Sequence, residues 1–369
     1  MSGSRLSKLF LIALCALGPF VFLIKAAVSP EGDAFPIPSA IPAVPVMIIT
    51  IDGVVASDLA GPRTAEPMPH LAALIRDSTH FASTMAASPG GSVFLASIAT
   101  GSLPLDHHVT KTGETLKPGF PTLATELKRQ AREKSLEMPA FVFSNSKLFS
   151  DANLQIGFDT IVEKPGAKAA DLAAEFQQKL GEHLPPRFFV WFDFRDLSNQ
   201  PSDRKAALSA IDEGIGSIIS VLHKHGIQGD GVLMLATDPG AGSPDAVPRG
   251  IVTIQLPYEY RSGVQCPVSI STIDLAPTAL EILRLGVPPS WRGRSRKIDV
   301  SRFVPTGPAL GGPCEWPQGS AWIAEQDAQT LIAVPGGSIV KFTDRANPRN
   351  STPSPALLQA IAGLQNAKK

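Results

Sequence analysis

Apolar runs and amphipathic stretches alternate along most of this chain. Residues 46–51 form a nearly continuous apolar run that ends at Asp52-Gly53, which is typical of a parallel strand buried on both faces. Similar runs predict strands at residues 140–143, 187–192, 232–236 and 250–254. Helices are predicted at residues 69–77, 94–100, 122–134, 204–225 and 273–285, and the helix at 204–225 shows the clearest apolar face.

Strands separated by helices predict an α/β fold, with a mainly parallel sheet covered by helices on both faces. Such sheets bind ligands outside the carboxyl ends of their strands. Asp52 and Asp238 each follow a predicted strand and are therefore candidate site residues. After about residue 300, short β-like segments at 321–323, 330–334 and 339–342 and a closing helix at 355–364 predict a small antiparallel β/α unit. We therefore divide the chain into an α/β domain, 46–300, and a C-terminal subdomain, 301–369.

The start of the chain has the pattern of an export signal. Arg5 and Lys8 precede an uncharged apolar stretch, residues 9–24, which is shorter than the ~20 residues that span a bilayer comfortably. With Lys25 snorkelling, residues 26–28 can extend it. Residues 1–28 are thus either a cleaved signal peptide or a retained membrane anchor, and the Pro- and Ala-rich residues 29–45 are a linker. Both alternatives place the domain outside the cytoplasmic membrane, in the periplasm or its equivalent.

The composition of the chain limits the classes of molecule that it can bind. The chain has 369 residues, enough for one large domain with a small appendage, and 33 basic residues balance 33 acidic ones. Zero net charge argues against nucleic acid, whose binding depends on excess cations. Outside the export segment the only cysteines are Cys266 and Cys314. An exported protein can pair them in a disulfide, two buried thiols are the alternative, and the sequence does not decide between them.

Four stretches resemble sulfatases of the alkaline-phosphatase-like superfamily. Residues 48–58 are similar to the family's opening strand and its "ITIDTLRAD" turn, and residues 88–101 match the length and ends of the signature "SPxCSPSRAxLLTG". Residues 157–160 resemble "GFDT", and residues 271–295 are similar to "DLAPTLLELAGLPVPxxxxGRS". The order and spacing of the four stretches, over about residues 46 to 345, imply the fold of this superfamily.

The resemblance implies a chemistry. Members of the superfamily cleave or transfer sulfate or phosphate esters. A divalent cation (Ca, Mg, Mn or Zn) held by strand-end carboxylates polarises the ester oxygens. A nucleophile stands at the start of a helix, where backbone N–H groups and the helix dipole favour anions. In sulfatases this nucleophile is a formylglycine made from Cys or Ser, and in phosphoryl-transferring relatives it is Thr or Ser.

Compared residue by residue, the metal-binding part of this pattern is incomplete. Asp52 stands where the family has its first metal ligand, but Gly53 follows where many sulfatases have a second Asp. Asp238 matches the first acid of "SDHG", but Pro239 replaces the neighbouring His and has no donor atom for a metal. Two carboxylates, with water filling the remaining positions, predict a weak site for a hard cation. The alternative for Asp52 is a helix cap or loop acceptor.

The catalytic part is also incomplete. The nucleophile position is Gly91, which has no side chain, so no formylglycine is expected. Ser92 follows one position later, and about 100° of helical rotation separates the two side-chain directions. Gly90, Gly91 and Ser92 remain candidates for anion binding. Two further departures are Leu95, where the family has Arg, and Ser198, where "DPH" has His. His107 matches the His of "PHRHG", and a polar turn is its alternative assignment.

Three function hypotheses follow. The first is a pseudoenzyme at the cell envelope that binds an anionic small molecule, glycan or lipid head group without turnover. The second is an active metal-dependent sulfate- or phosphate-ester hydrolase or transferase that uses Ser92, with His107 and the two aspartates. The third is a structural partner of a membrane complex. Covalent catalysis requires an activated nucleophile beside its helpers, and its absence from the motif favours the first hypothesis. The substrate, the identity of the metal and the oligomeric state are not encoded in these motifs.

Overall fold

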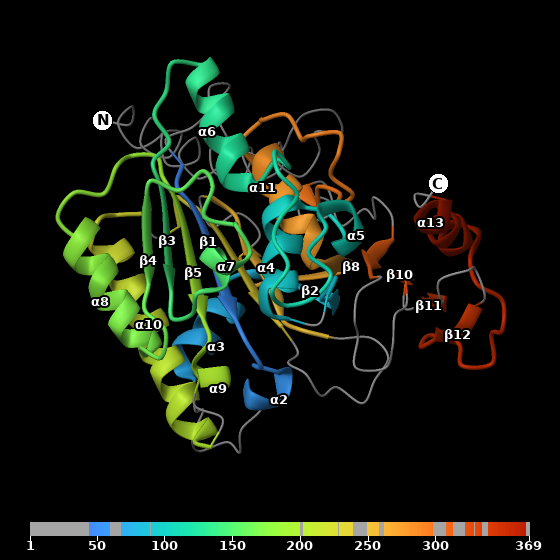
Figure 1. Ribbon diagram of the computed structural model, residues 1–369. Coiled ribbons are helices and arrows are strands. Elements are labelled where there is room, and N and C mark those ends of the chain that lie inside the picture. Colours follow the sequence, from blue (N-terminus) through green and yellow to red (C-terminus); the bar gives the residue numbers. More distant parts are fainter. Residues whose placement is uncertain are drawn as a thin grey trace, which may run out of the picture. The chain divides into compact units, whose positions relative to one another are not determined.

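The computed structural model describes residues 44–59, 68–88, 90–199, 202–227, 229–238, 249–257, 262–297, 308–312, 322–327, 329–333 and 339–366. An eight-stranded sheet runs through the large domain in the order β4-β3-β5-β1-β6-β7-β2-β8 (Figure 1). The strands are β1 (Val46–Ile51), β2 (Thr79–Met85), β3 (Ala140–Ser144), β4 (Thr160–Glu163), β5 (Phe189–Phe194), β6 (Val232–Thr237), β7 (Val252–Gln255) and β8 (Gln265–Ser271).

The predicted parallel sheet is confirmed, with one exception in strand direction. All neighbouring strands pair in parallel except β7, which runs antiparallel to both β6 and β2. The apolar run at 250–254 was predicted as another strand of the parallel type, and that direction is wrong. Burial on both faces explains the apolar run, but it carries no information on the direction of the strand. Strands β2, β4 and β8 were not predicted, because their sequences mix polar and apolar residues.

Helices cover both faces of the sheet. On one face α3 (Pro69–Arg76), α8 (Ala169–Leu180) and α10 (Arg204–Lys224) share a core with alternate strand residues such as Ile49 and Phe192. On the other face lie α4 (Gly91–Thr100), α5 (Pro104–His107), α6 (Leu123–Glu133), α7 (Leu148–Asp151) and α11 (Leu275–Ile282), the last preceded by a 3₁₀ turn, η2 (Thr272–Asp274). Two short helices, α2 (Ala56–Leu59) and α9 (Asp196–Asn199), follow β1 and β5 at their carboxyl ends.

The predicted antiparallel β/α unit is also present. Its sheet has the order β12-β11-β10-β9, from β9 (Ala309–Gly311), β10 (Trp322–Gln326), β11 (Gln329–Ala333) and β12 (Ile339–Asp344). Helix α13 (Pro355–Asn366) packs on β10 and β11. Trp322, Leu331 and Leu357 are buried together in the core between helix and sheet.

A buried carboxylate joins this small sheet to the large one. Glu325 of β10 is fully buried, and it accepts hydrogen bonds from Ser83 of β2 and Ser269 of β8. Arg249 forms two hydrogen bonds with the carboxylate, the shorter one 2.6 Å, and Arg345 forms a third at 3.2 Å. The two sheets are therefore connected through charge-assisted hydrogen bonds.

Several predictions fall outside the described residues. They concern the export segment, 1–28, most of the linker, 29–45, and the residues Pro239 and Cys314. Cys266 is buried in β8, and its pairing with Cys314 stays a prediction. Among the described helices, α10 is long and apolar enough to cross a membrane by length and composition. Its apolar face is part of the core between α3, α8 and the sheet.

Candidate functional site

The carboxyl ends of the three central strands bring together the two predicted acids. The last residues of β5, β1 and β6 are in register, so Arg195, Asp52 and Asp238 each follow their strand at the same level. The ladder continues by one hydrogen bond on each side, because the N–H of Asp52 donates to Phe194 O and that of Asp238 donates to Ile51 O, both at 3.0 Å. This edge lies near α2 and α9 in Figure 1. It is the edge where parallel sheets bind ligands.

Arg195, which the sequence did not single out, crosses the end of the central strand. Its Nε donates to Oδ1 of Asp193 at 2.9 Å, and its Nη1 donates to Oδ2 of Asp238 at 2.8 Å. Strands β5 and β6 are second neighbours, so their backbones are about 10 Å apart at the usual strand spacing. A side chain that joins them must pass over the end of β1. The guanidinium, which is only 4% exposed, therefore lies beside Asp52.

The aspartates around Arg195 differ in how many hydrogen bonds their oxygen atoms accept. Asp193 also accepts hydrogen bonds from the hydroxyls of Thr50 and Ser144, each at 2.9 Å. Asp52 accepts the N–H of Ser198 at Oδ2, 2.8 Å away, whereas its Oδ1 has no hydrogen-bond partner among the described residues. Nη2 of Arg195 likewise has none. The site thus holds one unused acceptor and one unused cationic donor.

These surroundings shift two pKa values. Burial raises the pKa of the Asp52 carboxyl to about 6, and the charge of Arg195 and the hydrogen bond from Ser198 only partly offset it. Burial lowers the pKa of Arg195, but the carboxylates of Asp193, Asp238 and Asp52 outweigh it, so that the net shift is upward. The guanidinium therefore remains charged at every relevant pH, while Asp52 takes up a proton in mild acid.

Helix α4 begins beside Asp238. A Cβ added at Gly90, where φ is +107°, would lie 3.0 Å from Oδ2 of Asp238. At Gly91, where φ is +59°, a Cβ would lie 3.3 Å from Oγ1 of Thr112. Glycine adopts these backbone angles readily and leaves room for the acid. The N-terminus of α4, whose first N–H groups lack intrahelical acceptors, can thus approach Asp238 and its bound guanidinium.

Ser92, the sequence candidate for nucleophile, is on this first turn. It is 1% exposed, and its Oγ has no hydrogen-bond partner among the described residues. An activated serine has a general base within hydrogen-bond reach. The described contacts of Ser92 include no such base.

His107, the other catalytic candidate, is used elsewhere. Its Nδ1 accepts the N–H of Val109 at 3.1 Å, so the ring proton is on Nε2, which lies 3.2 Å from Oγ of Ser97. Burial, with a smaller contribution from the charge of His108, lowers the pKa of His107 to about 3. The neutral ring therefore joins α5 to the middle of α4. Its described hydrogen bonds do not extend to Asp52 or Asp238.

The position that resembles "DPH" has a structural role on this edge. Oδ1 of Asp196 accepts the N–H of Ala169 at 3.0 Å, at the start of α8, and Oδ2 accepts from Nδ2 of Asn145 at 2.7 Å. Ser198 contributes its backbone N–H to Asp52. The short helix α9 thus orients Asp52 through the main chain.

A divalent metal ion does not fit this arrangement. Oδ2 of Asp238 and Oδ1 of Asp193 already receive the N–H groups of Arg195, which leaves Oδ1 of Asp52 as the acceptor without a partner. Within the described ranges, no three His, Cys, Asp or Glu side chains are grouped to hold a metal. A hard cation takes six or more oxygen ligands, some of them water, and the carboxylate oxygens that it would use here are already bonded to Arg195.

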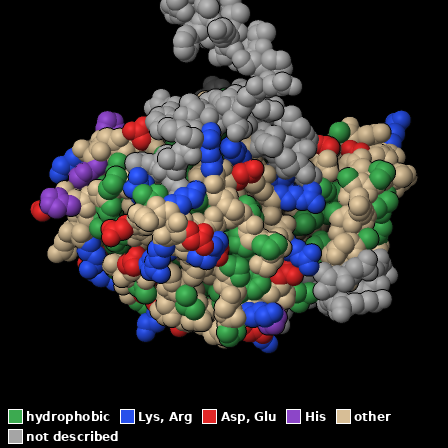
Figure 2. Space-filling view, turned by 90° about the horizontal axis from the view of Figure 1, so that it is seen from above, with side chains coloured by type: hydrophobic (Ala, Val, Ile, Leu, Met, Phe, Trp, Pro, Cys, Tyr) green, Lys and Arg blue, Asp and Glu red, His purple; other side chains and the backbone are tan. Residues whose placement is uncertain are grey.

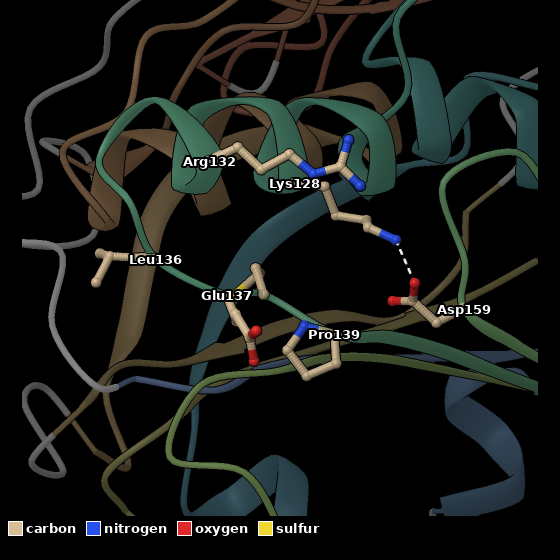
Figure 3. A pocket seen from close by; sticks show the side chains of 7 residues that line it. Lys128, Arg132, Leu136, Glu137, Pro139 and Asp159 are labelled. Carbon is tan, nitrogen blue, oxygen red and sulfur yellow. Dashed lines mark hydrogen bonds and ion pairs between the residues drawn. The ribbon is translucent and has the colours of Figure 1, made fainter.

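A cavity lies at the opposite end of the strands. This cavity of about 280 Å³ is lined by Lys128 and Arg132 of α6, residues 136–139 and Asp159. Figure 3 shows Lys128 extending toward Asp159, with which it forms an ion pair. Its lining residues 136–139 and Asp159 come directly before β3 and β4, so the cavity lies at the amino ends of these strands. Where Figure 2 shows described residues of that face, acidic and basic side chains are interspersed.

Comparison with known proteins identifies the fold. No family model matches the chain, and no curated protein matches it in sequence. Similar solved structures include a phosphonate monoester hydrolase from Silicibacter pomeroyi, with 16% identity, a TM-score of 0.63 and coverage of 88% of this chain and 94% of that one. A protein in the alkaline phosphatase superfamily from Vibrio parahaemolyticus has 16% identity, a TM-score of 0.61 and coverage of 93% and 94%. A 2-O GAG sulfatase has 11% identity, a TM-score of 0.61 and coverage of 88% and 91%. The resemblance read from the sequence is thus confirmed at the level of the fold.

Proposed function

We propose that this chain, with its alkaline-phosphatase-like fold, is an exported pseudoenzyme that binds an oxyanion at the carboxyl ends of β1, β5 and β6 without cleaving it. The observation that carries the proposal is the start of α4. Gly91 stands where the resemblance requires a nucleophile, and its φ of +59° is a conformation that side-chain-bearing residues rarely adopt.

The neighbouring groups support binding without turnover. Ser92 is buried and its described contacts include no base, and His107 is neutral and occupied by Ser97 and Val109. Neither group meets the requirement for nucleophilic or general-base catalysis, which is a hydrogen-bonded pair with a suitable pKa. The second function hypothesis, an active hydrolase, retains one supporting observation, the unpartnered Oγ of Ser92.

An anion is the ligand class that fits. Arg195 is charged and has an unused but buried Nη2, and the N-terminus of α4 offers backbone N–H groups and the positive end of its dipole. A sulfate or phosphate group matches both features, since guanidinium groups form charge-assisted hydrogen bonds with such oxygens. The export pattern at residues 1–28 suggests that this group is carried by an envelope glycan or lipid head group.

A matched pair of glycine variants tests the site. In Gly90→Ala the new methyl group would lie 3.0 Å from Oδ2 of Asp238 and push the carboxylate away, whereas in Gly166→Ala, where φ is +80°, it meets open space. Both substitutions impose a positive-φ cost, so only the first should weaken the binding of inorganic sulfate and phosphate in calorimetric titrations of the purified protein.

Turnover is measured in parallel with aryl sulfate, phosphate monoester and phosphodiester substrates, with and without divalent metal. We expect no hydrolysis by the wild-type protein and no change in Ser92→Ala. Metal-dependent hydrolysis that disappears in Ser92→Ala would overturn the proposal and establish Ser92 as the nucleophile. Equal anion binding by wild type and Gly90→Ala would show that the anion does not bind beside the start of α4.

A further inference from the structure

We propose that the guanidinium of Arg195 is the resident cation of the strand-end site, and that it excludes a divalent metal ion from the carboxylates there. The proposal concerns which cation neutralises Asp52, Asp193 and Asp238. It does not rest on the proposed anion binding, and it holds whether or not the protein has a ligand.

The position of the guanidinium is the first argument. Asp52 and Asp238 end adjacent strands, so an ion shared by their carboxylates would have to lie above the carboxyl end of β1. Arg195 reaches this region from the other side of β1 and contacts Oδ2 of Asp238 at 2.8 Å. The guanidinium and a metal ion would thus compete for the same carboxylate and nearly the same space.

The second argument is how firmly the guanidinium is held. Nε and Nη1 bind two different carboxylates at 2.9 and 2.8 Å, and the main-chain N–H of Arg195 donates to Oδ1 of Asn145 at 2.6 Å. Asp193 is itself fixed by the hydroxyls of Thr50 and Ser144. To admit a metal, Arg195 would have to leave its two carboxylate partners, and a buried guanidinium that loses them is strongly destabilising.

The third argument is charge. The three carboxylates attract a cation, and Arg195 already supplies one positive charge among them in a buried setting. A divalent ion in contact with Asp52 would lie within a few ångströms of this charge, where screening by water is weak. Removing Arg195 should therefore leave the carboxylates of Asp52, Asp193 and Asp238 without their buried counter-charge, and carboxylate oxygens are the ligand type that hard divalent ions prefer.

The test measures Mn²⁺ binding to the full chain by calorimetric titration and by electron paramagnetic resonance. We expect no saturable binding to the wild type at submillimolar Mn²⁺. Arg195→Ala should bind one Mn²⁺ per chain at least tenfold more tightly, and its melting temperature should rise as Mn²⁺ is added. The double variant Arg195→Ala/Asp52→Asn should lose the gained binding. Arg204→Ala removes an equal charge nearby, from a half-exposed arginine paired with Asp58, and should bind no Mn²⁺.

Two results would overturn the proposal. One is stoichiometric Mn²⁺ binding by the wild type that Asp52→Asn abolishes. The other is a folded Arg195→Ala, checked by circular dichroism, that binds no more Mn²⁺ than the wild type. If Arg195→Ala does not fold in buffer, Arg195→Gln, which is neutral and truncates the side chain less, is titrated in its place. Folding of Arg195→Ala that requires Mn²⁺ would support the proposal. Where neither variant folds, the wild-type titration decides.

Discussion

Replacing Asp52 by Asn should make the protein more stable, even though this residue ends the central strand of the site. The carboxyl is 4% exposed and one of its oxygens, Oδ1, lacks a partner among the described residues. Asn keeps an oxygen for the N–H of Ser198 and removes the buried negative charge. Folding thus no longer has to desolvate that charge.

The magnitude follows from the pKa of Asp52. Burial raises this pKa from 3.8 to about 6, so the folded protein holds the proton more tightly than the unfolded chain does. The contribution of Asp52 to stability is therefore fully present below about pH 3.8 and is lost as the pH rises through about 6. At about 1.4 kcal/mol per pH unit, the ionised carboxylate destabilises the fold by about 3 kcal/mol above pH 7. Asp52→Asn should recover most of that amount.

The assay is urea unfolding of wild type and Asp52→Asn between about pH 4 and pH 8. The difference in unfolding free energy should be close to zero at the acid end and grow to about 2–3 kcal/mol in favour of the variant at the alkaline end. Asp230→Asn, at an exposed turn before β6, is the matched control and should change stability little. Destabilisation by Asp52→Asn at pH 8 would refute the reasoning, because it would mean that a bound cation stabilises the carboxylate.

Four further predictions concern other parts of the chain. Glu325→Gln should cost about 3 kcal/mol at neutral pH in urea unfolding, because the arginine and serine partners of Glu325 outweigh its burial, which raises the pKa, and set this pKa at about 2. The wild type therefore loses this stability as the pH falls from about 4.5 to about 2. An equal cost at neutral pH and at about pH 2 would contradict the assignment. His107 should keep a neutral ring with its proton on Nε2 down to about pH 4 in nitrogen-15 NMR, and titration near pH 6.5 would show that its burial is wrong. Gly91→Ser should lower stability by about 1–2 kcal/mol and produce no turnover of sulfate or phosphate esters, whereas a gain of hydrolysis would show that only the side chain was missing. A reporter that is active only in the cytoplasm, fused at the C-terminus, should be silent, and a strong signal would exclude export.

The strands that the sequence predicted well are those whose environment is uniform. Residues 46–51 are buried on both faces, and the observed β1 has the predicted bounds. Strand β2 was missed because Thr79, Ser83 and Thr84 interrupt its apolar residues, and Ser83 is buried only because it meets Glu325 from a distant part of the chain. The sequence pattern also did not reveal that β7 runs antiparallel to its neighbours. Both failures depend on partners far away in the sequence.

The site was predictable in part. Asp52 and Asp238 were singled out as strand-end acids, and the structure places them on adjacent strands, although the strand order was not encoded in either run. Arg195 was missed because the segment was matched to a motif that begins at Asp196. A signal was present, since Asp193 and Arg195 alternate with Phe192 and Phe194 at the end of an apolar strand. Two opposite charges at strand spacing point to the same face and indicate a buried ion pair.

The bridge from Arg195 to Asp193 and Asp238 has a consequence for where this protein can work. A metal ion is in exchange with its surroundings, so the charge of a metal site varies with the ions and chelating molecules that a cell envelope meets. The guanidinium is covalently part of the chain and keeps its proton across the whole range of environmental pH. The positive charge beside Asp52 is therefore set at synthesis and is never lost by dissociation. In a compartment open to the outside, this positive charge at the ends of the central strands stays the same whatever metal ions the medium contains.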